Sequence, residues 1–155
     1  MQLAGEDSQV HLAVGSRFED IELVQIVIAE SLTRLRLDDD ESEDIALAVR
    51  EAVANAIKHG NRENPDKRVE VEVRLDGVEI EIRVTDEGRG FNPAGIRDPR
   101  ETENLLRPDG RGILFMREFM DDIDYTFLDE GGTVVTLRKR LVSCSSEPTK
   151  EEEVE

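Results

Sequence analysis

The sequence predicts an α+β domain in which helices cover one face of a mostly antiparallel sheet. Two segments carry apolar residues at helical spacing, and several others alternate apolar and charged residues with the period of a strand. Two of the alternating segments are joined by Asp76-Gly77, a strong signal for a tight hairpin. Strands with one apolar and one charged face are typical of a sheet that is covered on one side only.

Length and composition fit one domain and argue against two kinds of partner. The chain has 155 residues, with 37 acidic and 20 basic side chains and a formal charge of −17. Nucleic acid and anionic membranes are therefore not expected as partners, because both need clustered Lys and Arg. Cys144 is the only cysteine, and neither a leader nor an apolar run of ~20 residues is seen, so we expect a cytoplasmic protein.

The first half of the chain predicts a strand and two helices. Residues 1–8 are expected to be a flexible start, and the alternation over residues 10–14 predicts a short strand. Gly15 and Ser16 then introduce a helix that should end near residue 35. Its apolar face consists of Ile21, Val24, Ile28, Leu32 and Leu35.

The second helix has the most regular apolar stripe in the sequence. Asp40 with Glu43 three residues later forms a capping-box pattern, and Gly60, Asn61 and Pro65 mark the end of the helix. The stripe consists of Ile45, Ala48, Val49, Ala52, Val53, Ala56 and Ile57.

The second half predicts four strands, a long loop and a third helix. The hairpin covers residues 69–84, and residues 92–109 have no periodicity, which is typical of a functional loop. A helix is expected over 110–120, followed by strands over 123–127 and 133–141.

The end of the chain is polar and acidic. Residues 143–155 contain five Glu and one Lys, a net charge of −4, and are expected to be disordered. The folded domain is therefore expected over residues 9–142. Residues 1–142 still carry −13, so the acidity belongs to the folded body as well as to the tail.

Asp86 is the first candidate for chemistry. It continues the apolar parity of the strand that precedes it, so we expect its side chain on the buried side at the strand's end. A buried carboxylate needs hydrogen-bond donors, and the amino group of a purine would serve. Gly88 and Gly90 lack Cβ, so the backbone there could pass close to a flat ligand. Alternatively, Asp86 caps a turn and the glycines supply its geometry.

Glu51 and Asn55 are the second candidates. They stand four residues apart on one face of the second helix, and both lie outside its apolar stripe, with Asn55 at the margin. An amide oxygen suits Mg²⁺, and a carboxylate one turn away could accept a proton from an attacking hydroxyl. Alternatively, this is a solvated helix face. His59 lies one turn further on, where a capping or packing role is expected.

A second glycine loop opens the third helix. Gly110, Arg111 and Gly112 stand where free N–H groups and the helix dipole would suit phosphates. The glycines could instead serve helix entry alone, with Arg111 in water. Thr133 has the inward parity of the last strand, so it could face a bound base or bond to the backbone.

The order and spacing of these motifs resemble a known family. The segments EAVANAIKHGN (51–61), DEGRGF (86–91), GRGILFMREFMDDI (110–123) and GGTVVTL (131–137) are similar to the ATP-binding domain shared by gyrase, the heat-shock chaperone ATPase, histidine kinases and mismatch-repair ATPases. The first segment points to the small bacterial anti-sigma factors that are also serine-protein kinases. The resemblance covers about residues 10–142.

The resemblance implies a fold, cofactors and roles. The fold is a two-layer α/β sandwich with a mixed, mostly antiparallel sheet, the Bergerat-type ATP-binding fold. The cofactors are ATP and Mg²⁺. Glu51 would be the general base, Asn55 the Mg²⁺ ligand and Asp86 the reader of the adenine amino group. The base and ribose would be lined by Gly88, Gly90 and Thr133.

The resemblance also implies how the phosphates are held. Residues 92–109 would form a lid over them, and Gly110, Arg111 and Gly112 would cradle them. The lid has no obvious phosphate-binding Lys, so Arg107 and Arg111 are the candidates for charge.

Partners follow from the same resemblance. The protein would be a homodimer that keeps a sigma factor from RNA polymerase and phosphorylates a serine on an anti-anti-sigma protein of the STAS type. A histidine-kinase fragment would need a phosphoacceptor His on a separate helix, and the only histidines are His11 and His59. A gyrase-like ATPase would need a second domain and is not expected. An ATP-binding regulator of another target, without kinase activity, stays open.

Overall fold

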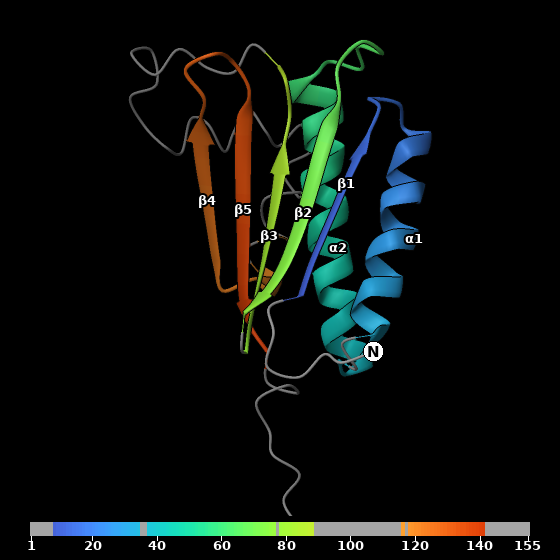
Figure 1. Cartoon of the computed structure of the whole chain (residues 1–155), viewed down its shortest axis with the longest axis vertical. Helices are drawn as coiled ribbons and strands as arrows, with labels where there is room; N and C mark the ends of the chain where they lie inside the picture. The colour runs from blue at the N-terminus through green and yellow to red at the C-terminus, as the bar shows by residue number, and fades with distance from the viewer. Residues whose placement is uncertain (1–7, 35–36, 77, 89–115, 117, 142–155) are drawn as a thin grey trace, which may run out of the picture.

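One antiparallel sheet with two helices on one face forms the part of the chain that the computed structural model describes, residues 8–34, 37–76, 78–88, 116 and 118–141 (Figure 1). The elements are β1 (Ser8–Val14), α1 (Glu19–Arg34), α2 (Asp39–Asn55), the π-helical turn η1 (Ala56–Gly60), β2 (Val69–Asp76), β3 (Glu79–Thr85), β4 (Asp122–Phe127) and β5 (Thr133–Arg140). The predicted α+β class is confirmed.

The strand order is β1-β2-β3-β5-β4, and each neighbouring pair is antiparallel. A mostly antiparallel sheet is therefore confirmed, and no parallel pair occurs among the described strands. The hairpin is also confirmed, because Asp76 pairs with Glu79 at the tip. The turn of the hairpin lies one residue later than predicted, because β2 includes Asp76 and β3 begins at Glu79.

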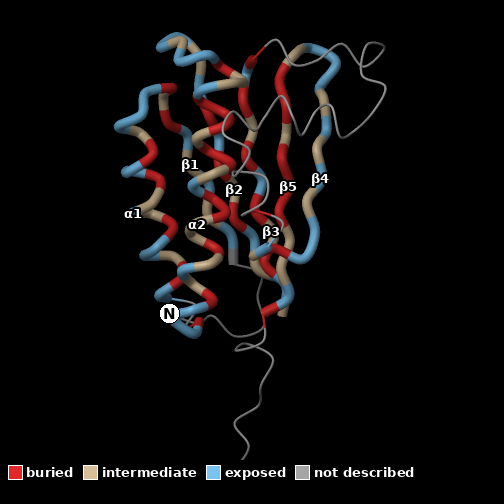
Figure 2. The backbone as a smooth tube through the Cα atoms, turned by 180° about the vertical axis from the view of Figure 1, so that it is seen from behind, coloured by how far each residue is buried: buried red, intermediate tan, exposed pale blue. Residues whose placement is uncertain are grey.

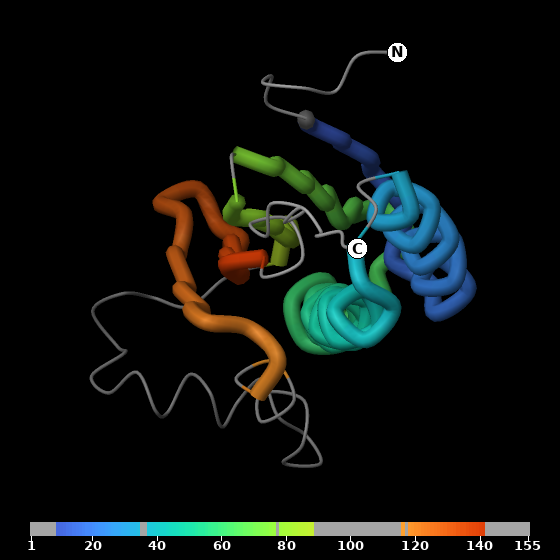
Figure 3. The backbone as a smooth tube through the Cα atoms, turned by 90° about the horizontal axis from the view of Figure 1, so that it is seen from below, coloured from blue at the N-terminus to red at the C-terminus, as the bar shows by residue number. Residues whose placement is uncertain are grey.

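The core lies between the sheet and the helices. Seen from below, α1 and α2 lie on the same side of the sheet (Figure 3). Buried residues gather where the helices meet the central strands, whereas β4 has no fully buried residue (Figure 2). On β3, Ile82 is wholly buried and pairs with Val73 of β2 and Leu137 of β5. The whole predicted apolar stripe of the second helix, from Ile45 on α2 to Ile57 on η1, is buried as well.

The outer face of the sheet carries paired charges. Arg138 of β5 donates to Glu81 at 3.0 Å and to Asp124 at 2.9 Å, which ties β5 to the strands on both sides. The hydrogen bond that Arg138 donates to Asp124 is the main cause that raises the pKa of Arg138. Pairs this exposed contribute about 0–1 kcal/mol each, so the face depends on the core beneath it for stability.

Both long helices begin at other residues than the sequence patterns indicated. α1 begins at Glu19 and not at Gly15, because the intervening Ser16 is buried and bonded elsewhere. α2 begins at Asp39, so the predicted capping box of Asp40 with Glu43 is wrong. Three consecutive acidic residues, Asp39 to Glu41, form the first turn of α2, where they interact favourably with the helix dipole.

The end of α2 widens into the π-helical turn η1. Its last bond runs from the Asn61 N–H to the Ala56 carbonyl, at 2.8 Å, five residues back. The helical segment therefore reaches Gly60, as predicted, with a final turn that is not α-helical. Single π turns are rare and occur often at functional sites. No helix in the described part of the chain is long and apolar enough to cross a membrane.

Asn61 joins this turn to three other segments. Its side chain is 1% exposed, and Nδ2 donates to Ser16 Oγ at 2.8 Å and to the Arg68 carbonyl at 3.0 Å. Its Oδ1 accepts the Glu87 N–H at 2.8 Å. The Ser16 hydroxyl in turn donates to the Lys67 carbonyl at 2.7 Å. One amide therefore connects the end of α2, the β1–α1 link, the approach to β2 and the residues after β3.

We expect Asn61→Asp to lower the free energy of unfolding by about 2–4 kcal/mol, because an oxygen would replace the donor of two buried hydrogen bonds and face the Arg68 carbonyl. Urea unfolding followed by circular dichroism measures this. Asn64→Asp is the matched control, since Asn64 is less buried and its Oδ1 only accepts the Asp66 N–H. Equal stability of the two variants would contradict the central role of Asn61.

Candidate functional site

Four predicted site residues gather at one end of the sheet. The C-terminal ends of α2 and β3 and the start of β5 all lie at the top of Figure 1. Asn55 belongs to the last turn of α2, Asp86 and Gly88 follow β3, and Thr133 begins β5. The backbone N–H of Asp86 donates to the Thr133 carbonyl at 3.0 Å, which fixes the end of β3 against β5.

Asp86 is buried, as its strand parity predicts. It is 6% exposed, and its Oδ1 accepts the Gly88 N–H at 2.9 Å. This bond is the turn-capping role that the sequence left open. A carboxylate has about four acceptor sites, so beyond its hydrogen bonds from the backbone it still has acceptor capacity for a ligand.

Burial is the main influence on the charge of Asp86. It raises the pKa of this carboxyl, because a low-dielectric environment disfavours the ionised form. The backbone N–H groups of Gly88 and Thr133 and the charge of Lys67 act in the opposite direction. A raised pKa together with remaining acceptor capacity is typical of a carboxylate in a ligand-binding site.

Three glycines allow the backbone to approach this carboxylate. A Cβ at Gly60 would overlap the Asp86 carboxyl group, and a Cβ at Gly88 would overlap the Gly60 carbonyl. A Cβ at Gly132 would lie 2.5 Å from the Asp86 carbonyl oxygen, and the φ of Gly132 is +111°. A side chain at Gly88 or Gly132 would require a shift of the backbone, and one at Gly60 would displace the Asp86 carboxyl group.

Asn55 is an almost buried amide with hydrogen-bonding capacity to spare. It is 7% exposed, and its Nδ2 has no partner among the described residues. The two ends of an Asn amide are exchangeable by rotation, so its oxygen can be presented instead. Glu51 lies one turn earlier on α2 and is partly exposed. Glu51 therefore lies outside the buried stripe of the helix, as predicted, whereas Asn55 is buried at its margin.

Asn55 fits a role as one ligand of Mg²⁺. The described residues contain no group of three or more His, Cys, Asp or Glu side chains that could hold a metal by themselves. Mg²⁺ in nucleotide sites is bound by one or two protein oxygens, water and the phosphates. A single amide oxygen at Asn55 suits that arrangement and does not suit a metal site made by protein alone.

His59 packs and does not provide a positive charge at the helix end. Burial, and then the charge of Lys58, lower the pKa of His59, so its ring is neutral at neutral pH. Its Nε2 is buried and has no partner among the described residues. Of the two predicted roles, packing is therefore favoured over capping by a cation.

Some predicted residues fall outside the described part of the chain, and others were missed. Gly90, Arg107, Gly110, Arg111 and Gly112 lie outside the described residues, so their roles stay predictions.

Sequence reasoning treated Gly60, Asn61 and Gly132 only as breaks between elements. Their contacts with Asp86 and Glu87 join residues 26 or more positions apart, or depend on backbone distances, which no local pattern contains. A consecutive Gly-Asn after a long helix was the one available signal.

Comparison with known proteins gives the relatives of this chain. Residues 14–139 match the family model of the histidine kinase-like ATPase domain. The Anti-sigma F factor of Heyndrickxia coagulans is 33% identical over 139 residues, which cover 86% of this chain and 93% of that protein. The Anti-sigma F factor of Bacillus subtilis (strain 168) is 30% identical over 138 residues, with the same coverage.

A solved structure gives the same fold. It is the crystal structure of the RsbU and RsbW domains of Rv1364c from Mycobacterium tuberculosis, with a TM-score of 0.64 at 21% identity. The match covers 86% of this chain and 32% of that longer one, so the shared part is one domain of it. From the family model and the curated relatives together, the chain belongs to the histidine kinase-like ATPase domain family and, within it, to the anti-sigma F factors.

Proposed function

We propose that this protein is an ATP-binding anti-sigma factor and serine-protein kinase. It would sequester a sigma factor and phosphorylate a serine on an anti-anti-sigma partner of the STAS type, as a homodimer in the cytoplasm. The names of its relatives support the first half of this proposal. The observation that carries the ATP site is the buried Asp86 carboxylate, which has acceptor capacity available and three glycines around it.

Asp86 would identify the nucleotide by its base. Its carboxylate can accept a further hydrogen bond from the adenine amino group, which offsets the cost of burying the carboxylate. The Gly88 N–H holds one oxygen at 2.9 Å, so the carboxylate is already oriented before a base arrives. Thr133 is 4% exposed and adjoins Asp86, which suits a hydroxyl that completes the contact with the base.

The phosphate end of the site would lie toward α2. Asn55 would present its amide oxygen to Mg²⁺, which bridges phosphate oxygens and neutralises their charge when it is bound. Gly110, Arg111 and Gly112 would hold the phosphates through backbone N–H groups and one cation, with Arg107 as a second cation. Among the described residues, no group of three or more His, Cys, Asp or Glu side chains offers the metal another site.

Glu51 would be the general base. It lies one helical turn from Asn55, so the acceptor hydroxyl and the metal-bound phosphates would be served by neighbouring side chains. Its partial exposure keeps the carboxylate accessible to a serine of another protein. A base so placed would accept the serine proton as the hydroxyl attacks the terminal phosphate.

Binding of ATP is expected to release protons at acidic pH. In the free protein burial raises the pKa of Asp86, and a donated amino N–H would favour the ionised form and lower that pKa. Between the lowered and the raised pKa, free Asp86 holds a proton that the complex does not hold. Affinity should therefore rise as pH rises through the pKa of free Asp86.

Calorimetry in buffers of different ionisation enthalpy measures this proton release. Asp86→Asn is the control, because its amide does not titrate, whereas the phosphates of ATP titrate equally in both proteins. The wild type should release more protons than the variant at acidic pH and the same number at alkaline pH. Identical release at every pH would remove Asp86 from the base-binding site.

Glu51→Ala is expected to lower phosphoryl transfer by about 10²–10⁴-fold while ATP affinity changes little, because a general base acts on the acceptor. A pull-down from the source cell with and without ATP supplies the acceptor protein. Transfer from labelled ATP to that acceptor is then measured. Glu43→Ala is the matched control, an exposed carboxylate two turns earlier on the same helix. If Glu51→Ala transferred phosphate at the wild-type rate, Glu51 would be excluded as the general base. If an acceptor bound to the wild type without being labelled, the protein would be an ATP-binding regulator without kinase activity.

A further inference from the structure

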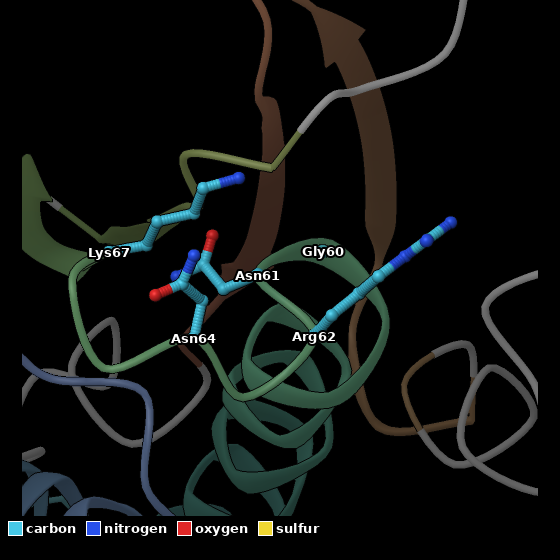
Figure 4. Close-up of a pocket in the computed structure, with 5 residues that line it drawn as sticks. All are labelled: Gly60, Asn61, Arg62, Asn64 and Lys67. Carbon is cyan, nitrogen blue, oxygen red and sulfur yellow. The ribbon is translucent and has the colours of Figure 1, made fainter.

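The turn between η1 and β2 encloses a hollow of about 260 Å³ that the proposed ATP site does not use. It adjoins the Asp86 end of the sheet, because Gly60 contacts the Asp86 carboxylate. The described residues that line it are Gly60, Asn61, Arg62, Asn64 and Lys67 (Figure 4).

The charge of this hollow is opposite to that of the chain. Two of the described lining side chains, Arg62 and Lys67, are basic and none is acidic, in a chain with a formal charge of −17. Both extend in the same direction from the turn, on either side of Gly60 (Figure 4). Neither forms an ion pair with another described residue, although acidic residues outnumber basic ones by 37 to 20.

The polar groups of the hollow are mostly donors. The side-chain oxygen of Asn61 already accepts the Glu87 N–H, and that of Asn64 accepts the Asp66 N–H, both at 2.8 Å. The Asn64 amide nitrogen, the Arg62 guanidinium and the Lys67 ammonium have no partner in the part of the chain that is described. Donors without competing acceptors are what an oxyanion requires, and hydrogen bonds from charged donors are the strongest ones.

The backbone of the turn is held in an unusual conformation. Arg62 and Glu63 are consecutive non-glycine residues with φ of 54° and 56°. Each such residue costs about 1 kcal/mol or more, so the surrounding structure must enforce it. The Glu63 N–H bonds to the Ile57 carbonyl at 2.8 Å, and the buried Asn61 fixes the start of the turn. The backbone from which Arg62 extends is therefore set by the fold.

We propose that this hollow binds a phosphate group, separate from the phosphates of ATP. Arg62 would hold two of its oxygens with the guanidinium fork, and Lys67 and the Asn64 amide would bind the others. The hollow has room for a tetrahedral anion with water around it. The group could come from inorganic phosphate or from a phosphoserine side chain, which share this chemistry.

Occupancy of the hollow would weaken ATP binding. Gly60 lines the hollow and lies against the Asp86 carboxyl group, and the charge of Lys67 is the smallest of the influences that oppose the raised pKa of Asp86. A phosphate bound to Lys67 would cancel that influence and make the ionised carboxylate less favourable. This coupling rests on the proposed function, whereas binding of phosphate to the hollow does not.

Amide NMR spectra of the full chain, with inorganic phosphate added at constant ionic strength, test the site. We expect saturable shifts at Gly60, Arg62 and Lys67. Arg62→Gln and Lys67→Gln should each weaken binding about tenfold, the value of one charged hydrogen bond. Lys139→Gln, at the other end of β5, is the matched control and should change nothing. Shifts that do not saturate, or that saturate at the same phosphate concentration in Lys67→Gln as in the wild type, would overturn the proposal.

Two further titrations identify the source of the group and the coupling. Free phosphoserine that binds more tightly than inorganic phosphate would assign the hollow to a modified side chain, and the reverse would assign it to the free ion. Binding of glutamate with equal strength would contradict selection of phosphate. Calorimetry of ATP with and without phosphate should show weaker ATP binding in wild type and no change in Lys67→Gln. An equal change of ATP affinity in both proteins would exclude the coupling between the hollow and the ATP site. Failure of ATP to bind at all would contradict the proposed function, whereas the phosphate titration would be unaffected.

Discussion

Contact between the Asp86 carboxylate and the backbone of Gly60 is the constraint on which this end of the molecule depends. It brings a charged group at the end of a strand directly against the end of a helix, with no side chain between them. Burial of this kind is costly unless donors are placed in advance. The Gly88 N–H provides one, and an incoming ligand can provide another. In the proposed function, this strand end is therefore the binding site.

The π-helical turn and Asn61 make this contact possible. A regular helix would end with i to i−4 bonds, whereas the wider turn gives the Asn61 N–H a partner at Ala56 and brings Gly60 to the carboxylate. The Asn61 side chain then bonds to Ser16 and Glu87, so β1–α1 and the end of β3 are positioned by one group. Movement of the segment that leads into α1 would therefore displace Asn61 and, through it, the backbone next to Asp86.

The sequence was sufficient for features that a single element defines. The alternation on β2 and β3 and the stripe on α2 report how each element is buried, so the sheet, the first two helices and the inward side of Asp86 were predicted correctly. The capping box of Asp40 was not, because several acidic residues in a row offered more than one start for the helix.

Features that depend on contacts between distant segments were beyond the sequence. In the sequence, Asn61 looks like an ordinary residue at the end of a helix. Its four hydrogen-bond partners come from four different parts of the chain. Gly132 is required because of the backbone behind it, which only a three-dimensional arrangement reveals. The same reason hid the basic hollow, whose two cations, Arg62 and Lys67, look like routine surface residues in an acidic chain.

The central claim is that Asp86 recognises the adenine amino group. Calorimetric titration of the wild-type protein with ATP and with inosine triphosphate tests it most directly, because the second nucleotide has a carbonyl oxygen in place of the amino group. Loss of a hydrogen bond to a buried charged group costs about 1.5–3 kcal/mol, so inosine triphosphate should bind at least about tenfold more weakly. Equal affinity for the two nucleotides would contradict the account.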